Sequence, residues 1–131
     1  AEFANEKGSD LVIRIHADGS ESSSLNGASM LLPSPKRENG EYLTPRVVSE
    51  SRRAGELILT EVTAATGAQN RGLVERPDMT GFNWSKVPVV LLEMGFMSNP
   101  EEEAKLAGAE YRTKIVGAIA DGTEKYFLTA E

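Results

Sequence analysis

The apolar positions along the chain predict four β-strands. The most hydrophobic stretch, Val87–Leu92, shows no alternation, which is typical of a strand covered on both faces in a largely parallel sheet. Pro88 lacks a ladder donor and is expected at the beginning of this strand. Asp10–His16 alternates between two faces and predicts a second strand. Two shorter strands are predicted at Gly27–Leu32, compatible with an edge of the sheet, and at Arg71–Arg76.

A long helix is predicted after the Gly27–Leu32 strand. Thr44 is a suitable N-cap, Pro45 is favoured at the first helical position, and Gly67 lies where the helix is expected to end. Small and apolar residues recur at spacings of three and four and define the face that we expect to be buried: Val47, Ser51, Ala54, Ile58, Val62 and Ala65. The opposite face is expected to be solvated and carries Glu50, Arg52, Arg53 and Glu56.

Two further helices are expected after Val87–Leu92. Asn99 is a suitable N-cap, Pro100 suits the first helical position, and the acidic residues that follow are favourable beside the helix dipole. This helix is expected to end near Ala107, before a last helix over 109–127. The apolar stripe of the last helix is expected to pack on the sheet, with Gly117 and Gly122 allowing close approach, and comprises Tyr111, Ile115, Ala118, Ile119, Gly122 and Tyr126.

The order of these elements predicts one α/β domain over residues 1–131, a mostly parallel twisted sheet flanked by helices. Ala1–Lys7 is typical of the last turns of a helix that Gly8 ends. We therefore expect this chain to be the later part of a longer domain, incomplete at its N-terminus.

The composition excludes several classes of function. The formal net charge of −6 argues against a nucleic-acid partner, and no apolar stretch is long enough to span a membrane. The absence of cysteine rules out disulfides, cysteine-ligated metals and thiol nucleophiles. His16 is the single histidine, so a zinc site on this chain needs carboxylates or residues from outside the chain to complete it.

His16 and Glu93 are the candidate site residues. Each is expected at the carboxyl end of a buried strand, the side of an α/β sheet where ligands bind. If the two strands are neighbouring and parallel, both side chains lie at the same end of the sheet. We call this end, where the strands that carry His16 and Glu93 have their carboxyl ends, the rim. An imidazole and a carboxylate there suit a hydrolytic zinc centre. Taken singly, His16 is also compatible with a half-buried structural histidine, and Glu93 with a solvated residue at a strand end.

The segments around this rim are less specific. Gly95 is expected to let the backbone turn tightly after Glu93. Phe82 and Trp84, in the loop before Val87–Leu92, either line a substrate groove or cover the edge of the sheet. The sequence assigns no substrate-binding residue.

Two segments resemble a known enzyme family. IRIHAD (Ile13–Asp18) and VPVVLLEMGFMSNPEEE (Val87–Glu103), with a strand and a long helix between them, resemble the zinc-dependent N-acetylmuramoyl-L-alanine amidases of the bacterial cell-wall hydrolase type. The resemblance covers essentially the whole chain. The E-x-G-F-x-S-N-x-x-E segment is highly specific, whereas I-H-A is specific only in combination with it.

The resemblance implies a fold, a reaction and two roles. The implied fold is a twisted six-stranded α/β sheet flanked by helices, of phosphorylase/hydrolase-like type. The implied reaction is hydrolysis of the amide bond between N-acetylmuramic acid and L-alanine in peptidoglycan. His16 is implied to bind Zn2+, and Glu93 to be the catalytic acid/base that takes a proton from water and passes it to the leaving amine. The implied setting is extracytoplasmic: secreted, periplasmic or associated with the cell wall.

The chain also departs from the family pattern. Arg14 and Asp18 stand where a small polar residue and an asparagine are usual, and Arg14 shares the face of His16, where it is a candidate groove residue. The family's second histidine, in an H-G-G-like motif, and a further glutamate have no counterpart motif here. We expect them in an N-terminal segment, in the same protein or as a separate chain.

Two other interpretations remain open on the sequence. One is a degenerate, zinc-free amidase domain that binds cell-wall polymer or a partner without catalysis. The other is a structural α/β domain that shares only core residues with the family. An autolysin, a sporulation or germination enzyme and a phage endolysin are all compatible with the pattern.

Overall fold

The computed structural model describes residues 1–18, 26–96 and 98–129. Its elements follow the order α1 (Glu2–Lys7), β1 (Val12–Asp18), β2 (Ala28–Pro33), α2 (Pro45–Thr66), β3 (Asn70–Arg76), α3 (Thr80–Asn83), β4 (Val89–Phe96), α4 (Pro100–Ala107) and α5 (Ala109–Leu128). The predicted order of elements is confirmed, and the one-turn helix α3 is added before β4. In the described part of the chain, no helix combines the length and the hydrophobicity needed to cross a membrane.

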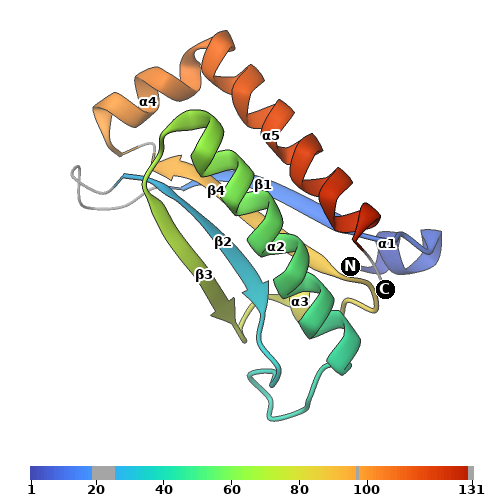
Figure 1. Cartoon of the computed structure of the whole chain (residues 1–131). Helices are drawn as coiled ribbons and strands as arrows, with labels where there is room; N and C mark the ends of the chain where they lie inside the picture. The colour runs from blue at the N-terminus through green and yellow to red at the C-terminus, as the bar shows by residue number, and fades with distance from the viewer. Residues whose placement is uncertain (19–25, 97, 130–131) are drawn as a thin grey trace.

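The described strands form one mixed sheet in the order β1-β4-β2-β3 (Figure 1). β1 and β4 are parallel, β2 and β3 are parallel, and β2 and β4 are antiparallel. The sheet is therefore mostly parallel, as predicted. An edge position for the Gly27–Leu32 segment is wrong, because β2 lies between β4 and β3 and all its residues are buried. The turn residues on either side of this segment mark where the strand begins and ends, but they do not show which strands pair with it.

Helices cover both faces of the sheet (Figure 1). α2 and α5 pack on one face, where their apolar stripes meet alternate residues of β2 and β4, among them Ala28, Met30, Leu32, Val90 and Leu92. α3 covers part of the other face through Phe82, which is fully buried against Leu31, Val89 and Leu91. Phe82 therefore packs in the core against the two internal strands, and it neither lines an open groove nor covers an edge of the sheet.

One glycine sets the distance between α2 and α5. A Cβ at Gly122 would lie 2.6 Å from the backbone Cα of Ile58, so the two helices meet closely here, as predicted. The same expectation for Gly117 is wrong, because a Cβ there would meet nothing within 4 Å. Gly117 lies on the same helix but does not face α2.

We predict that Gly122→Ala destabilises the protein, whereas Gly117→Ala does not. The added methyl at position 122 meets backbone that has no side-chain freedom to yield, and overpacking of this kind costs about 1 to 3 kcal/mol. At position 117 the same change should leave stability unchanged or raise it by about 0.5 to 1 kcal/mol, because alanine is the better helix former. Urea unfolding of both variants measures the difference, and equal stabilities would contradict the packing described here.

Candidate active site

His16 and Glu93 are direct partners in the pairing of β1 with β4. Paired residues on adjacent strands share a face, and Glu93 alternates with Val89 and Leu91 on the face that α3 covers. His16 Nδ1 lies 3.9 Å from Glu93 Oε1. The structure thus brings together the two residues that the sequence singled out.

The two side chains differ in their exposure to solvent. The side chain of His16 is 50% exposed, whereas that of Glu93 is 10% exposed. Their separation is longer than a hydrogen bond, so the imidazole is not committed to this carboxylate. A largely buried carboxylate can exchange a proton with a molecule held at the rim, and an open imidazole nitrogen can bind a metal or move a proton.

Neither residue ends its strand, contrary to the prediction. β1 continues to Asp18 and β4 continues to Phe96, because the two strands keep pairing beyond His16 and Glu93. Gly95 likewise lies within β4 and is not among the glycines with a positive φ, so the expected tight turn is wrong. Glycine at position 95 instead leaves room for Glu102, since a Cβ there would lie 3.0 Å from the carboxylate of Glu102.

A β-bulge shapes the rim beyond Glu93. Between the His16–Glu93 pair and the Asp18–Phe96 pair, β1 advances by two residues and β4 by three. The extra residue reverses the alternation of β4, so Phe96 returns to the face that carries Glu93. The aromatic residue of the E-x-G-F motif therefore borders the candidate site.

Ser29 lies on the other side of Glu93. It is the antiparallel register partner of Glu93 on β2, and it is 9% exposed. His16, Glu93 and Ser29 thus occupy one row across three strands. Ser29 was not predicted as a site residue, because no local sequence pattern shows which strand runs beside β4.

Glu102 joins three elements at the same rim. It belongs to α4, is 5% exposed, and its Oε1 accepts hydrogen bonds from the backbone N–H groups of Gly27 at 2.8 Å and Phe96 at 3.1 Å. The side chain of Asn99 caps α4, as predicted, by accepting from the N–H groups of residues 101 and 102. The sequence pattern placed Glu102 in an acidic first turn, whereas its carboxylate ties the start of β2 to the end of β4.

Metal ligands are few in the described residues. No group of three or more His, Cys, Asp or Glu side chains there is placed to hold a metal ion. His16 is the single imidazole in the chain. The described residues therefore offer one preferred zinc ligand at this rim and an acidic neighbour.

Arg14 points away from the rim. Its Nη1 lies 2.6 Å from the position that a Cβ on Gly81 would take, and both residues line a hollow together with Val12, Thr80 and Ser85. The guanidinium of Arg14 is therefore directed towards α3. The role of Arg14 as a groove residue stays a prediction.

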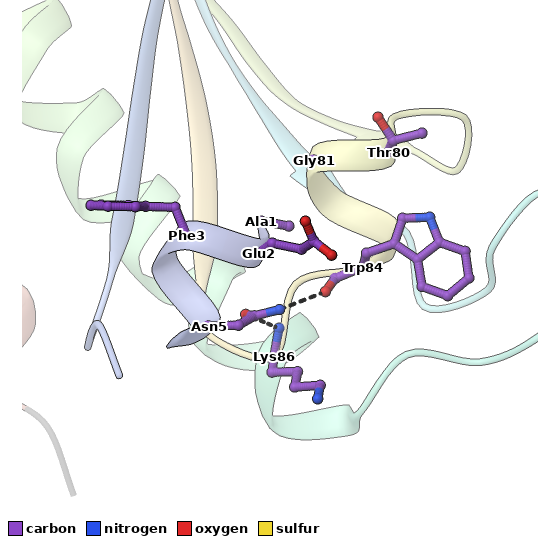
Figure 2. Close-up of a pocket in the computed structure, with 8 residues that line it drawn as sticks. All are labelled: Ala1, Glu2, Phe3, Asn5, Thr80, Gly81, Trp84 and Lys86. Carbon is purple, nitrogen blue, oxygen red and sulfur yellow. Dashed lines mark hydrogen bonds between the residues drawn. The ribbon is translucent and has the colours of Figure 1, made fainter. Parts of the chain in front are cut away.

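Trp84 lines a hollow beside α1 (Figure 2). The hollow measures about 720 Å³, and Trp84 is 56% exposed, with the guanidinium of Arg37 4.7 Å from its ring centroid. The side chain of Asn5 holds this segment by donating to the carbonyl of Trp84 and accepting from the N–H of Lys86 (Figure 2). Because these residues precede β4, the hollow lies at the opposite end of that strand from Glu93.

Comparison with known proteins identifies the family. The family model described as N-acetylmuramoyl-L-alanine amidase (Amidase_3) matches residues 1–125. This chain belongs to the N-acetylmuramoyl-L-alanine amidase family. His16, Glu93 and Glu102 all lie within the matched residues.

Individual relatives agree with this amidase assignment. The N-acetylmuramoyl-L-alanine amidase LytC of Bacillus subtilis is 34% identical over 118 residues, which cover 90% of this chain and 22% of LytC. The N-acetylmuramoyl-L-alanine amidase AmiA of Escherichia coli is 30% identical, over 96% of this chain and 55% of AmiA. The crystal structure of the amidase Ami1 from Mycobacterium smegmatis superposes with a TM-score of 0.82 at 29% identity, over 96% of this chain and 57% of that one. The chain thus spans little more than half of AmiA and Ami1, and less of LytC.

We predict that Glu102→Ala destabilises the protein by removing the carboxylate that connects β2 and β4 at the rim. The change leaves two backbone N–H groups without their carboxylate acceptor, and the loss should reach about 2 kcal/mol or more. Glu103→Ala removes an exposed carboxylate from the same helical turn and should change stability by no more than about 0.5 kcal/mol. Thermal or urea unfolding compares the two variants; a similar effect of both would show that the carboxylate of Glu102 does not stabilise the rim.

Proposed function

We propose that this chain carries the catalytic acid/base and one zinc ligand of an enzyme that hydrolyses the amide bond between N-acetylmuramic acid and L-alanine in peptidoglycan. Membership of the amidase family supports this class of reaction. The observation that carries the proposal is the pairing of His16 with Glu93, which puts an imidazole nitrogen 3.9 Å from a carboxylate oxygen on one face of the sheet.

His16 has the chemistry and the exposure of a zinc ligand. Imidazole nitrogen is a preferred ligand of zinc, and half of this side chain is open to solvent. A catalytic zinc site takes about three protein ligands. The described residues hold no group of three such ligands, and His16 is the single histidine of the chain. We therefore infer that at least one further ligand lies outside residues 1–131, in a larger catalytic domain. When bound, zinc polarises a carbonyl oxygen and lowers the pKa of a water molecule.

Glu93 acts as the acid/base that transfers a proton during hydrolysis. Its carboxylate is largely buried beside His16, where it can accept a proton from the attacking water. The same group, once protonated, can donate that proton to the nitrogen of L-alanine as the amide bond breaks. Glu93 sits within a paired strand and not on a loop, so its position relative to His16 is set by the sheet register.

The substrate determines the setting. Peptidoglycan lies outside the cytoplasmic membrane, so we infer that the enzyme acts extracytoplasmically, on the cell wall. A zinc-free domain that only binds wall polymer is the competing proposal, and measurements of metal content and activity separate the two.

We predict that Glu93→Gln in the complete protein retains zinc but loses amidase activity. The amide keeps the size of the side chain but neither accepts nor donates the proton, and such losses are typically about 100-fold to 10,000-fold in rate. Release of peptide from purified peptidoglycan measures the activity, and elemental analysis measures zinc. Glu103→Gln, an exposed change on α4, is the matched control and should retain full activity. Full activity of the Glu93 variant would refute the role assigned here.

Zinc content also tests the role of His16. We predict near-stoichiometric zinc in the complete protein, much weaker binding after His16→Ala, and little zinc in the 131-residue chain alone, which offers one imidazole. The absence of zinc from the complete protein would favour the domain that binds without catalysis. Unchanged zinc binding after His16→Ala would remove this residue from the site.

A further inference from the structure

A cation lies at the rim beside the candidate site. Arg71 is the second residue of β3, and its side chain is packed against Gly27, where a Cβ would lie 3.0 and 3.1 Å from the Cγ and Cδ of Arg71. Gly27 precedes Ser29 by two residues, and Ser29 pairs with Glu93. Strand geometry therefore puts Gly27 on the order of 8 Å from Glu93.

An aromatic ring places the guanidinium of Arg71. The bulge in β4 returns Phe96 to the face of Glu93, and the guanidinium carbon of Arg71 lies 5.5 Å from the centroid of the Phe96 ring. Such a cation–π contact favours a guanidinium held over the ring face. The charge of Arg71 is thereby held on the same side of the sheet as the candidate catalytic residues.

Within the described residues, Arg71 lacks the acidic partner that four other arginines have. Four arginines form ion pairs with carboxylates: Arg37, Arg52, Arg53 and Arg76. In the part of the chain that the structure describes, no carboxylate oxygen comes within 4.0 Å of the guanidinium of Arg71, whose one recorded hydrogen bond is a long one, 3.4 Å, to the carbonyl of Asn26. Arg71 is also exposed. No described carboxylate therefore occupies its planar donors, which have the geometry to bind a carboxylate of a ligand.

We propose that Arg71, held against Phe96, is a specificity-determining residue that binds a free carboxylate on the peptide side of the substrate. This inference rests on the proposed function, because the reacting amide is placed at Glu93. An extended peptide spans about 3.5 Å per residue, so a carboxylate about two residues beyond the amide reaches Arg71. A guanidinium binds a carboxylate through two parallel hydrogen bonds, which a carboxamide does not reproduce.

The test compares two synthetic N-acetylmuramoyl dipeptides that begin with L-alanine. They differ only in the second residue, which carries either a free carboxylate or a carboxamide. Calorimetry on the complete protein measures the Kd of each compound, and product release measures kcat/KM. We expect the wild-type protein to prefer the free acid about tenfold in both quantities, which corresponds to about 1.4 kcal/mol.

Three variants separate recognition from stability. Arg71→Gln should abolish the preference while leaving the carboxamide compound unaffected, and Arg71→Lys should retain part of it, because lysine keeps the charge but not the planar fork. Arg46→Gln removes an exposed arginine from the start of α2 and should retain the full preference. Equal weakening of both compounds by Arg71→Gln would overturn the inference.

The outcomes also distinguish this inference from the proposed function. Hydrolysis of both compounds without preference would leave the amidase proposal standing and overturn the carboxylate site. A preference in Kd that depends on Arg71, without hydrolysis, would support the carboxylate site and contradict the amidase proposal. The absence of binding to either compound would overturn both.

Discussion

The parallel pairing of β1 with β4 is the interaction on which the candidate site depends. It joins residues 77 positions apart in the chain and sets His16 directly opposite Glu93. A slip of one residue would move one of the two side chains to the face under α2 and α5. Apolar contacts on both faces of β4 oppose such a slip, because Val90 and Leu92 pack under α2 and α5 while Val89 and Leu91 pack with Phe82.

The rim above this pairing is held by buried polar contacts and by two glycines. Glu102 accepts from the backbone of both β2 and β4, and its carboxylate occupies the space left by the absent side chain of Gly95. Arg71 occupies the corresponding space beside Gly27, which has a φ of 107°. The two glycines at the rim therefore leave room for side chains from other elements. The candidate site residues themselves lie on strands whose position is fixed by packing.

Local signals in the sequence were sufficient for the elements and for the two principal candidates. Caps and apolar periodicity located α2, α4 and α5, because these features act within a few residues. His16 and Glu93 stood out because each follows a strongly apolar strand pattern. The wrong predictions concern which elements lie next to each other. β2 is an internal strand and not an edge strand, and a Cβ at Gly117 would contact no other element. Strand order and the orientation of a helix depend on segments that are distant in the chain.

The sequence by itself determined an α/β domain of the amidase family with a histidine and a glutamate near strand ends. Hydrophobic periodicity and a specific motif carry that information, because both are local. Only the tertiary structure decided that Ser29 lies beside Glu93, that a bulge turns Phe96 towards the site, and that Glu102 is a buried bridge. These features arise from register and from contacts between elements, which no local pattern specifies.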